Sequence, residues 1–372
     1  MQGTRRHARA RRRRLRRLTV MWSIIGVAVL GVVGFGAGAA TGLIPVFQQS
    51  HSESAGTPQP VAPSPTLTPS PTPEPQPTTT TPTPEPTVPS PPTPPTPAAS
   101  PATQECATET TMSVMAHYDD DLIFANPTIA NAMAADLCVR TVFVTAGDAG
   151  SGMQYATSRE SGILSAYDVL RGSDLPWTEE HFTLASGLPV TRFTASDDPS
   201  ISVTFLRLPD GNIKGDGFEA TGWESLARLR TDTISVIHTV DSHAEVSLNL
   251  LQASLTELTS AYSPTNVLTL VPNESWASKR DHSDHSAVGS LTRAAAQAAG
   301  VPAAQLHYAT GYGNKDRPAN VTGAALDLKL LAFWTYTQYD SVMKCKTPAD
   351  CLNIKMFGHS LEREYFLTDA EL

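Results

Sequence analysis

The stretch Met112-Ser113-Val114-Met115-Ala116 runs directly into His117-Tyr118-Asp119-Asp120, so an apolar run ends in a polar cluster of ligand-type residues. Such a short apolar run is typical of a strand buried on both faces of a parallel sheet. A second cluster, His282-Ser283-Asp284-His285, follows another strand-like run at residues 266–271. We expect both clusters just past the C-terminal ends of strands, where open α/β sheets place their sites.

Strand and helix patterns alternate around these two clusters, which predicts an α/β fold with a mostly parallel sheet flanked by helices. A further strand is expected at residues 140–145, stopped by Gly147-Asp148-Ala149-Gly150. The helices are expected at residues 127–137, 158–171, 248–262 and 286–299.

The N-terminal part of the chain has the composition of a membrane anchor. Residues 1–17 hold nine arginines and no acid, and residues 18–44 hold no charged residue. The apolar run exceeds the roughly 20 residues that cross a bilayer, and the arginines indicate a cytoplasmic N-terminus. We expect a single-pass anchor with the rest of the chain outside the cell. The alternative is a signal peptide cleaved at Ala37-Gly38-Ala39, which also exports the rest.

Residues 45–103 are predicted to be a disordered Pro/Thr/Ser-rich linker. The part from residue 51 onward holds 19 of the 30 prolines. Such a segment cannot bury a core, so we expect an extended, solvated stalk between the membrane and residues 104–372.

Residues 104–372 are long enough for one α/β domain and are acidic. The whole chain has 27 basic and 36 acidic residues; without the nine N-terminal arginines and three linker glutamates, 18 and 33 remain, a net charge of −15. An acidic exported domain is a poor candidate for nucleic-acid binding.

All four cysteines lie in the exported part, and an even number outside the cell predicts disulfides. Cys345 and Cys351 would close a short loop, which leaves Cys106 and Cys138 as the other pair. Zinc binding by these cysteines is disfavoured because their spacing is not that of a zinc ribbon or finger.

The two clusters together supply two imidazoles and a carboxylate for one metal ion. We predict His117, Asp120 and His285 as the ligands, since both side chains of a His-x-x-Asp turn can reach a common point. Zinc with three protein ligands keeps a position open for water, whose pKa falls toward 7. Two histidines and one carboxylate also suit Fe(II), so the sequence leaves the metal open between zinc and another divalent ion.

The remaining polar residues of the clusters suit acid–base work on that water. Asp119 is the predicted general base, and His282 is an acid or an oxyanion stabiliser. Asp284 would orient an imidazole. Taken singly, each residue would more often belong to a surface turn, and it is their pairing at strand ends that favours a site.

These motifs resemble those of the PIG-L/LmbE family of zinc-dependent N-acetylglucosaminyl deacetylases. The family's Ala-His-Pro-Asp-Asp-Glu stands here as Ala116-His117-Tyr118-Asp119-Asp120-Asp121, and its His-Pro-Asp-His stands as His282-Ser283-Asp284-His285. The resemblance implies a Rossmann-like, LmbE-like fold. It assigns zinc, the base and the oxyanion or acid role to the same residues as the spacing does.

Weaker resemblances extend across most of residues 110–370. Arg159 resembles a sugar-contacting arginine of the family, and Asp210, in Leu208-Pro209-Asp210-Gly211, resembles an aspartate that meets a sugar hydroxyl. The resemblance therefore implies substrate binding for both. Read alone, Arg159 is a helix-surface charge and Asp210 a turn residue.

The motifs depart from the family pattern at three positions. Tyr118 and Ser283 replace prolines that stiffen the motif loops, and Asp121 replaces a glutamate. No predicted ligand or catalytic residue is lost. The role of Asp121 is expected to be a bond to nearby backbone or stabilisation of the helix entry.

These features lead us to expect a membrane-anchored, outward-facing hydrolase that removes acetyl groups from N-acetylated amino sugars. The anchor and the stalk favour an envelope glycan or its fragments as the substrate. One alternative is a metal-dependent amidohydrolase acting on another acylated compound. Another is a non-catalytic carbohydrate-binding wall module with a closed, structural zinc site.

Overall fold

The structure is a computed structural model and describes residues 100–372. The predicted arginine-rich tail, the anchor and nearly all of the linker lie outside the described residues and stay predictions. Within residues 100–372, no helix has both the length and the apolar composition that crossing a membrane requires.

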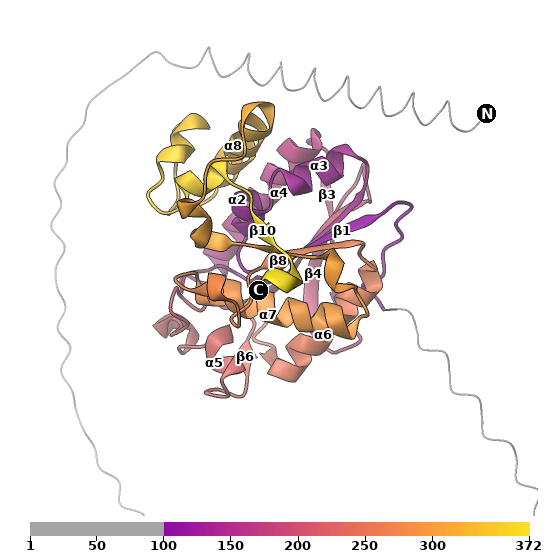
Figure 1. Cartoon of the computed structure of the whole chain (residues 1–372). Coiled ribbons are helices and arrows are strands. Elements are labelled where there is room, and N and C mark those ends of the chain that lie inside the picture. The colour runs from indigo at the N-terminus through magenta and orange to yellow at the C-terminus, as the bar shows by residue number, and fades with distance from the viewer. Residues whose placement is uncertain (1–99) are drawn as a thin grey trace, which may run out of the picture. The chain divides into compact units, whose positions relative to one another are not determined.

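The described residues fold around a sheet of eight strands in the order β10-β9-β8-β1-β2-β5-β4-β3 (Figure 1). Strands β9, β8, β1, β2 and β5 form parallel pairs, whereas β10 at one edge, and β4 and β3 at the other, pair antiparallel. The strands are β1 (Thr110–Met115), β2 (Cys138–Thr145), β3 (Trp177–Thr183), β4 (Pro189–Ala195), β5 (Ile201–Leu208), β8 (Asn266–Leu270), β9 (Leu306–Ala309) and β10 (Phe366–Leu367).

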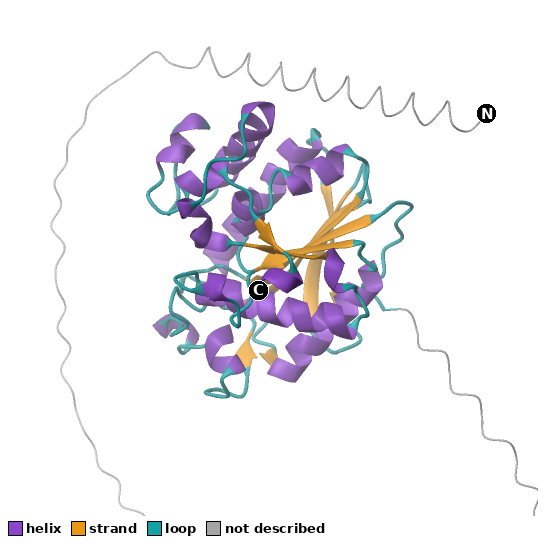
Figure 2. Cartoon of the chain, viewed as in Figure 1, coloured by secondary structure: helices purple, strands orange, loops and turns teal. Residues whose placement is uncertain are grey.

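Helices cover both faces of this sheet (Figures 1 and 2). One layer contains α2 (Asp120–Phe124), α3 (Thr128–Ala134), α4 (Met153–Arg171) and α8 (Gly323–Thr337). The other contains α5 (Leu226–Arg230), α6 (Leu248–Tyr262) and α7 (Ser283–Ala298). The two-residue strands β6 (Ile237–His238) and β7 (Glu245–Val246) pair with each other away from the main sheet.

The predicted α/β class with a mostly parallel sheet is confirmed. Every residue of β1, β2 and β5 is buried, as expected for strands that are covered on both faces. The three predicted strands correspond to β1, β2 and β8, with ends shifted by at most two residues. The predicted helix at residues 248–262 coincides with α6.

The sequence did not predict the antiparallel edge strands or the short helix α2. Most residues of β3 are exposed, and its sequence has no apolar pattern that would predict a strand. Helix α7 begins at Ser283 rather than at residue 286, so the second cluster spans the start of a helix.

Both predicted disulfides are present, between Cys106 and Cys138 and between Cys345 and Cys351. The first joins the segment before β1 to the first residue of β2. No cysteine of the described residues is free.

The strand order changes direction between β1 and β8. The chain passes from β1 to β2 and β5 on one side, and later returns to form β8 and β9 on the other side of β1. Connections that leave neighbouring parallel strands in opposite directions open a crevice at the strands' C-terminal ends, where ligands bind.

Candidate active site

The two predicted clusters meet at this point of the sheet. The first follows β1, and Asp119 is the N-terminal cap residue of α2. The second follows the loop after β8, where the His282 side chain caps α7 by accepting a hydrogen bond from Asp284 N at 3.2 Å. All eight predicted site residues are buried, and none is more than 7% exposed. The tertiary structure therefore joins segments about 160 residues apart in one interior site.

The three predicted metal ligands lie side by side. His285 Nε2 is 3.0 Å from Asp120 Oδ1, and His117 Nδ1 is 3.4 Å from Asp120 Oδ2. Asp120 Oδ2 also accepts a hydrogen bond from the backbone N of His117 at 2.7 Å, which fixes the His-x-x-Asp turn.

The environment of His285 fits a bound cation. Its Nδ1 lies 2.9 Å from Asp281 Oδ1 and donates to that carboxylate, so in the neutral ring Nε2 carries a lone pair. This buried Nε2 faces Asp120 and has no hydrogen-bond partner among residues 100–372. A lone pair and a carboxylate oxygen held 3.0 Å apart repel each other unless a cation or a proton lies between them.

The same region offers overlapping donor sets. Ligand atoms of His117, His282 and His285 lie within 4.8 Å of one another, and so do those of His117, Asp210, His282 and Asp284. Both groups include His282, and neither includes the predicted ligand Asp120. Imidazole nitrogen with carboxylate oxygen suits zinc and other divalent transition metals. The assignment of Asp120 rather than His282 as the third ligand stays a prediction.

The predicted ligands strongly shift one another's pKa values. Burial acts to lower the pKa of His285, but Asp120 and Asp281 outweigh it and raise the pKa to about 10. Burial acts to raise the pKa of Asp120, but the two histidines hold it well below its usual value. The carboxylates thus create a negative potential that favours positive charge at this point, whether a proton or a metal ion.

Asp119, the predicted base, is held by Arg159. Arg159 Nη2 donates to Asp119 Oδ1 at 2.8 Å, and both side chains are buried. Burial raises the pKa of Asp119, while the charge of Arg159 acts to lower it. A carboxylate with a raised pKa is a stronger proton acceptor and suits general-base work.

Arg159 makes its remaining contacts inside the protein. It donates to Tyr336 Oη at 2.5 Å and to the carbonyl oxygen of Gly147, and Asp340 Oδ2 lies 3.4 Å away. Gly147 has φ +52°, and a Cβ there would clash with Arg159 Nη1, so this close approach requires glycine. The reading of Arg159 as a helix-surface charge is wrong, because the residue is only 6% exposed. Its sugar contact stays a prediction.

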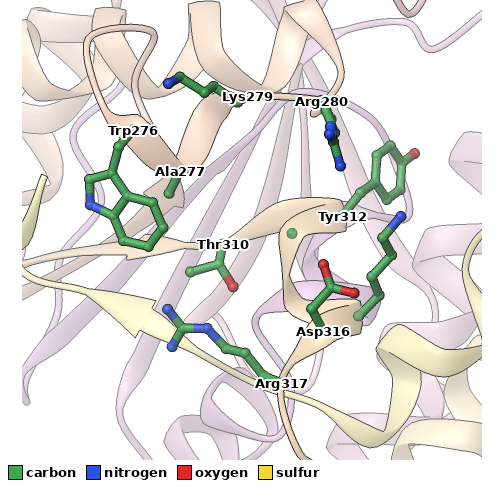
Figure 3. A pocket seen from close by; sticks show the side chains of 10 residues that line it. Trp276, Ala277, Lys279, Arg280, Thr310, Tyr312, Asp316 and Arg317 are labelled. Atoms are coloured by element: carbon green, nitrogen blue, oxygen red, sulfur yellow. The ribbon is translucent and has the colours of Figure 1, made fainter.

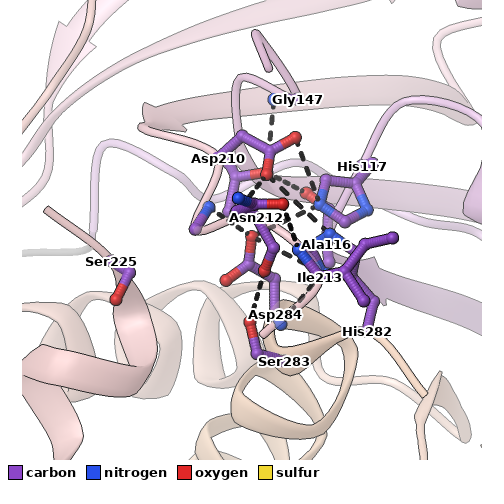
Figure 4. Close-up of polar contacts among 12 residues, drawn as sticks. Ala116, His117, Gly147, Asp210, Asn212, Ile213, Ser225, His282, Ser283 and Asp284 are labelled. Atoms are coloured by element: carbon purple, nitrogen blue, oxygen red, sulfur yellow. Dashed lines mark hydrogen bonds and ion pairs between the residues drawn. The ribbon is translucent and has the colours of Figure 1, made fainter. Parts of the chain in front are cut away.

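Asp284, Asp210 and His282 gather around His117 (Figure 4). Asp284 Oδ2 is 3.3 Å from His117 Nε2 and 3.8 Å from His282 Nδ1, so the imidazole it contacts more closely is that of His117. Asp284 Oδ2 also accepts from Gly211 N at 2.8 Å, which ties the second cluster to the loop of Asp210. Asp210 Oδ2 is 3.8 Å from His117 Nε2. The residue therefore lies in the site, but its predicted sugar contact is untested.

His282 has an unusually low proton affinity. Burial is the main cause, and His117 adds to it, so the pKa falls to about 4. Because Nδ1 accepts a hydrogen bond from Asp284 N, the neutral ring carries its proton on Nε2. That arrangement suits a neutral hydrogen-bond donor better than a strong acid.

Asp281 is a site residue to which the sequence assigned no role. Besides binding His285, its Oδ1 accepts from His282 N at 2.9 Å and from Tyr312 N at 3.2 Å. Its position four residues before His285 is the only signal in the sequence. That spacing does not by itself predict the contact, because Asp281 lies two residues before the first residue of α7.

The two residues that replace family prolines tie their loops in place by hydrogen bonds. Tyr118 is fully buried, and its hydroxyl donates to Glu160 Oε1 at 3.0 Å. Ser283 Oγ donates to the carbonyl oxygen of Asn212 at 2.8 Å. Asp121 accepts from Leu122 N at 2.7 Å and from the Tyr167 hydroxyl at 2.6 Å, which confirms the expected bond to nearby backbone.

Comparison with protein families identifies the domain around this site. Residues 112–296 match the family described as PIG-L, GlcNAc-PI de-N-acetylase. Residues 112–296 form a PIG-L family domain. Both clusters lie within it, so the predicted resemblance is confirmed. The family match and the histidine–aspartate cluster together support a metal-dependent deacetylase.

Solved structures show only a distant likeness. The conserved protein TT1542 from Thermus thermophilus is 19% identical, with 62% of this chain and 79% of that chain covered and a TM-score of 0.35. GalB, the 4-carboxy-2-hydroxymuconate hydratase from Pseudomonas putida, is 13% identical (62% and 84% covered, TM-score 0.35). N,N'-diacetylchitobiose deacetylase from Pyrococcus horikoshii is 14% identical (63% and 71% covered, TM-score 0.35). A search of curated proteins returns no match.

Proposed function

We propose that this chain is a metal-dependent hydrolase that removes N-acetyl groups from GlcNAc-type amino sugars. The observation that carries the proposal is the convergence of His117, Asp120 and His285 in one buried site beside Asp119. The PIG-L match supports the same reaction. The metal would be zinc, or Fe(II) or another divalent ion that this donor set also suits.

His117, Asp120 and His285 would hold the metal, which would supply Lewis-acid polarisation and a more acidic water. Asp119 accepts a proton from the water that attacks the acetyl carbonyl. His282 donates a hydrogen bond from Nε2 to the developing oxyanion. Asp119 then returns the proton to the leaving nitrogen, so that the products are acetate and the free amino sugar. Arg159 keeps the Asp119 carboxylate in place throughout.

We further propose that the domain works outside the cell, on an envelope glycan or its fragments, and is anchored through residues 18–44. The arginine block, the apolar run and the Pro/Thr-rich linker of the sequence support this placement. The two disulfides support an oxidising compartment.

Acetate release from GlcNAc oligomers and from purified wall polymers tests the proposal. We expect release that stops after a chelator removes the metal and resumes when zinc is restored. Asp119→Asn keeps the size of the side chain but loses the base, so turnover should fall by about 10²–10⁴-fold. Activity that persists both after metal removal and in Asp119→Asn would contradict the mechanism.

A further inference from the structure

A basic cavity adjoins the candidate active site. Its volume is about 320 Å³, and it is formed by the segments 276–280 and 310–317 (Figure 3). Its aromatic and charged side chains include Trp276, Lys279, Arg280, Lys315, Asp316 and Arg317.

The charge of this cavity is opposite to that of the domain. Four cationic side chains and one carboxylate line it, whereas residues 104–372 carry a net charge of −15. Within residues 100–372, no carboxylate forms an ion pair with Lys279, Arg280 or Lys315. Cations gathered without partners repel one another and concentrate positive potential in a concave site, which attracts an anion.

The cavity shares a wall with the predicted metal site. Tyr312 lines the cavity, and its ring centroid lies 5.2 Å from that of His285. Arg280 directly precedes Asp281, the carboxylate that binds His285 Nδ1. Tyr312 therefore contacts both the cavity and the predicted metal site.

An aromatic side chain suited to a sugar ring stands at the edge of the cavity. Trp276 is 59% exposed, and its Nε1 donates to the carbonyl oxygen of Glu371 at 3.1 Å, which holds the indole in position. Figure 3 shows Trp276 on one side of the cavity and Arg280 with Tyr312 on the other. An ordered indole with a large exposed area can stack on a sugar ring at low entropic cost.

Six of the ten residues that line this cavity lie outside the family domain. Residues 310–317 follow the matched segment 112–296, so Lys315 and Arg317 are contributed by the part of the chain beyond it.

We propose that this cavity is a subsite for an anionic group, a phosphate or a carboxylate, carried by the sugar next to the N-acetylated one. The inference rests on the proposed deacetylase function and names the substrate class. Guanidinium and ammonium groups bind both anions through charge-assisted hydrogen bonds.

Deacetylation of paired substrates tests the subsite. Three GlcNAc disaccharides would be used as substrates: a neutral one, one that carries a phosphate and one that carries a uronic-acid carboxylate. Deacetylation of each would be measured with the parent full-length chain, with Lys315→Gln and with the double variant Arg280→Gln/Lys315→Gln. We expect the ratio of kcat/KM for anionic over neutral substrate to fall about tenfold in the double variant, mainly through KM. Lys346→Gln, an exposed lysine outside the cavity, is the matched control and should leave the ratio unchanged. The anionic substrate with the larger ratio of kcat/KM over the neutral substrate shows whether the subsite prefers phosphate or carboxylate. A ratio that stays the same in Lys315→Gln and in the double variant overturns the proposal.

Direct binding separates this proposal from the catalytic one. Inorganic phosphate and glucuronate would be titrated calorimetrically into the full-length protein, the double variant and Asp119→Asn. We expect the double variant to bind at least one of the two anions about tenfold more weakly, and Asp119→Asn to bind it as the parent does. If this pattern appears without any deacetylation, the subsite stands and the proposed function fails. If both anions bind the double variant as tightly as the parent, or bind neither protein, the subsite is wrong whatever the activity.

Discussion

Arg159 Nη2 lies 2.8 Å from Asp119 Oδ1, so the predicted base of the reaction is paired with a buried cation. Their positions are 40 residues apart, at the N-terminus of α2 and within α4. Arg159 is in turn held by Tyr336 on α8. Helices α2, α4 and α8 of one layer thus hold the base and its cation in place.

The first prediction concerns the pH dependence of the reaction. Because the charge of Arg159 acts to lower the pKa of Asp119 against the effect of burial, Arg159→Gln should raise that pKa further. The base must be ionised to work, so the acidic limb of kcat/KM against pH should move to higher pH by the same amount. Arg159→Lys keeps the charge and should move it less. Identical limbs in the parent and in Arg159→Gln would show that Asp119 is not the titrating base.

The second prediction separates the alternative ligand sets. If His117, Asp120 and His285 bind the metal, Asp120→Ala and His285→Ala should lose it, whereas His282→Ala should keep about one ion per chain and lose activity. Elemental analysis of the purified variants measures this without any assay of turnover. Loss of metal in His282→Ala together with retention in Asp120→Ala would favour the three-histidine group instead.

The third prediction concerns Tyr118, which stands where the family has proline. Tyr118→Phe removes the hydroxyl that donates to Glu160, an acceptor that is also paired with Arg207 at 2.7 Å. A hydrogen bond to a charged group contributes about 1.5–3 kcal/mol, so the free energy of unfolding in urea should fall by about that amount. Tyr339→Phe is the control, since this residue is 42% exposed and its hydroxyl has no hydrogen bond within residues 100–372. Equal stability of the two variants would contradict the tether.

The fourth prediction uses the buried Lys329. Burial lowers its pKa to about 7, against the opposing effect of Glu364, while the unfolded value is about 10.4. Between these values the unfolded chain binds a proton that the folded one does not, so rising pH stabilises the fold, and this gain is lost progressively as the pH falls from about 10 to about 7.

Lys329→Met removes this titration and the nitrogen that lies 2.8–3.1 Å from the carbonyl oxygens of Ile123, Asn126 and Arg363, two of which the neutral amine can bond at a time. Urea unfolding at pH 7.5 and 9.5 should therefore show a stability difference between parent and variant that grows by about 1–2 kcal/mol at the higher pH. A difference that does not change with pH would mean that the folded lysine keeps its ordinary pKa.

Local sequence determined much of the fold and the chemistry of the site. Strands β1, β2 and β8 are visible because burial on both faces leaves a short continuous apolar run. Helix α6 is visible because burial of one stripe leaves a helical period in the sequence. The disulfides followed from the even number of cysteines, their spacing and the predicted export of this part of the chain. The ligand-type residues stood out because few other residue types bind metal.

Contacts between distant segments were decided by the tertiary structure. The edge strands β3 and β10 depend on pairing with a neighbour rather than on an apolar pattern. Arg159 looks like a surface charge until α4 packs against α8, and Asp281 gains its role only from its contact with His285 in the folded chain. Residue types can suggest a metal site, but the pKa of each group and the partner of each charge depend on burial and on distances that only the folded chain sets.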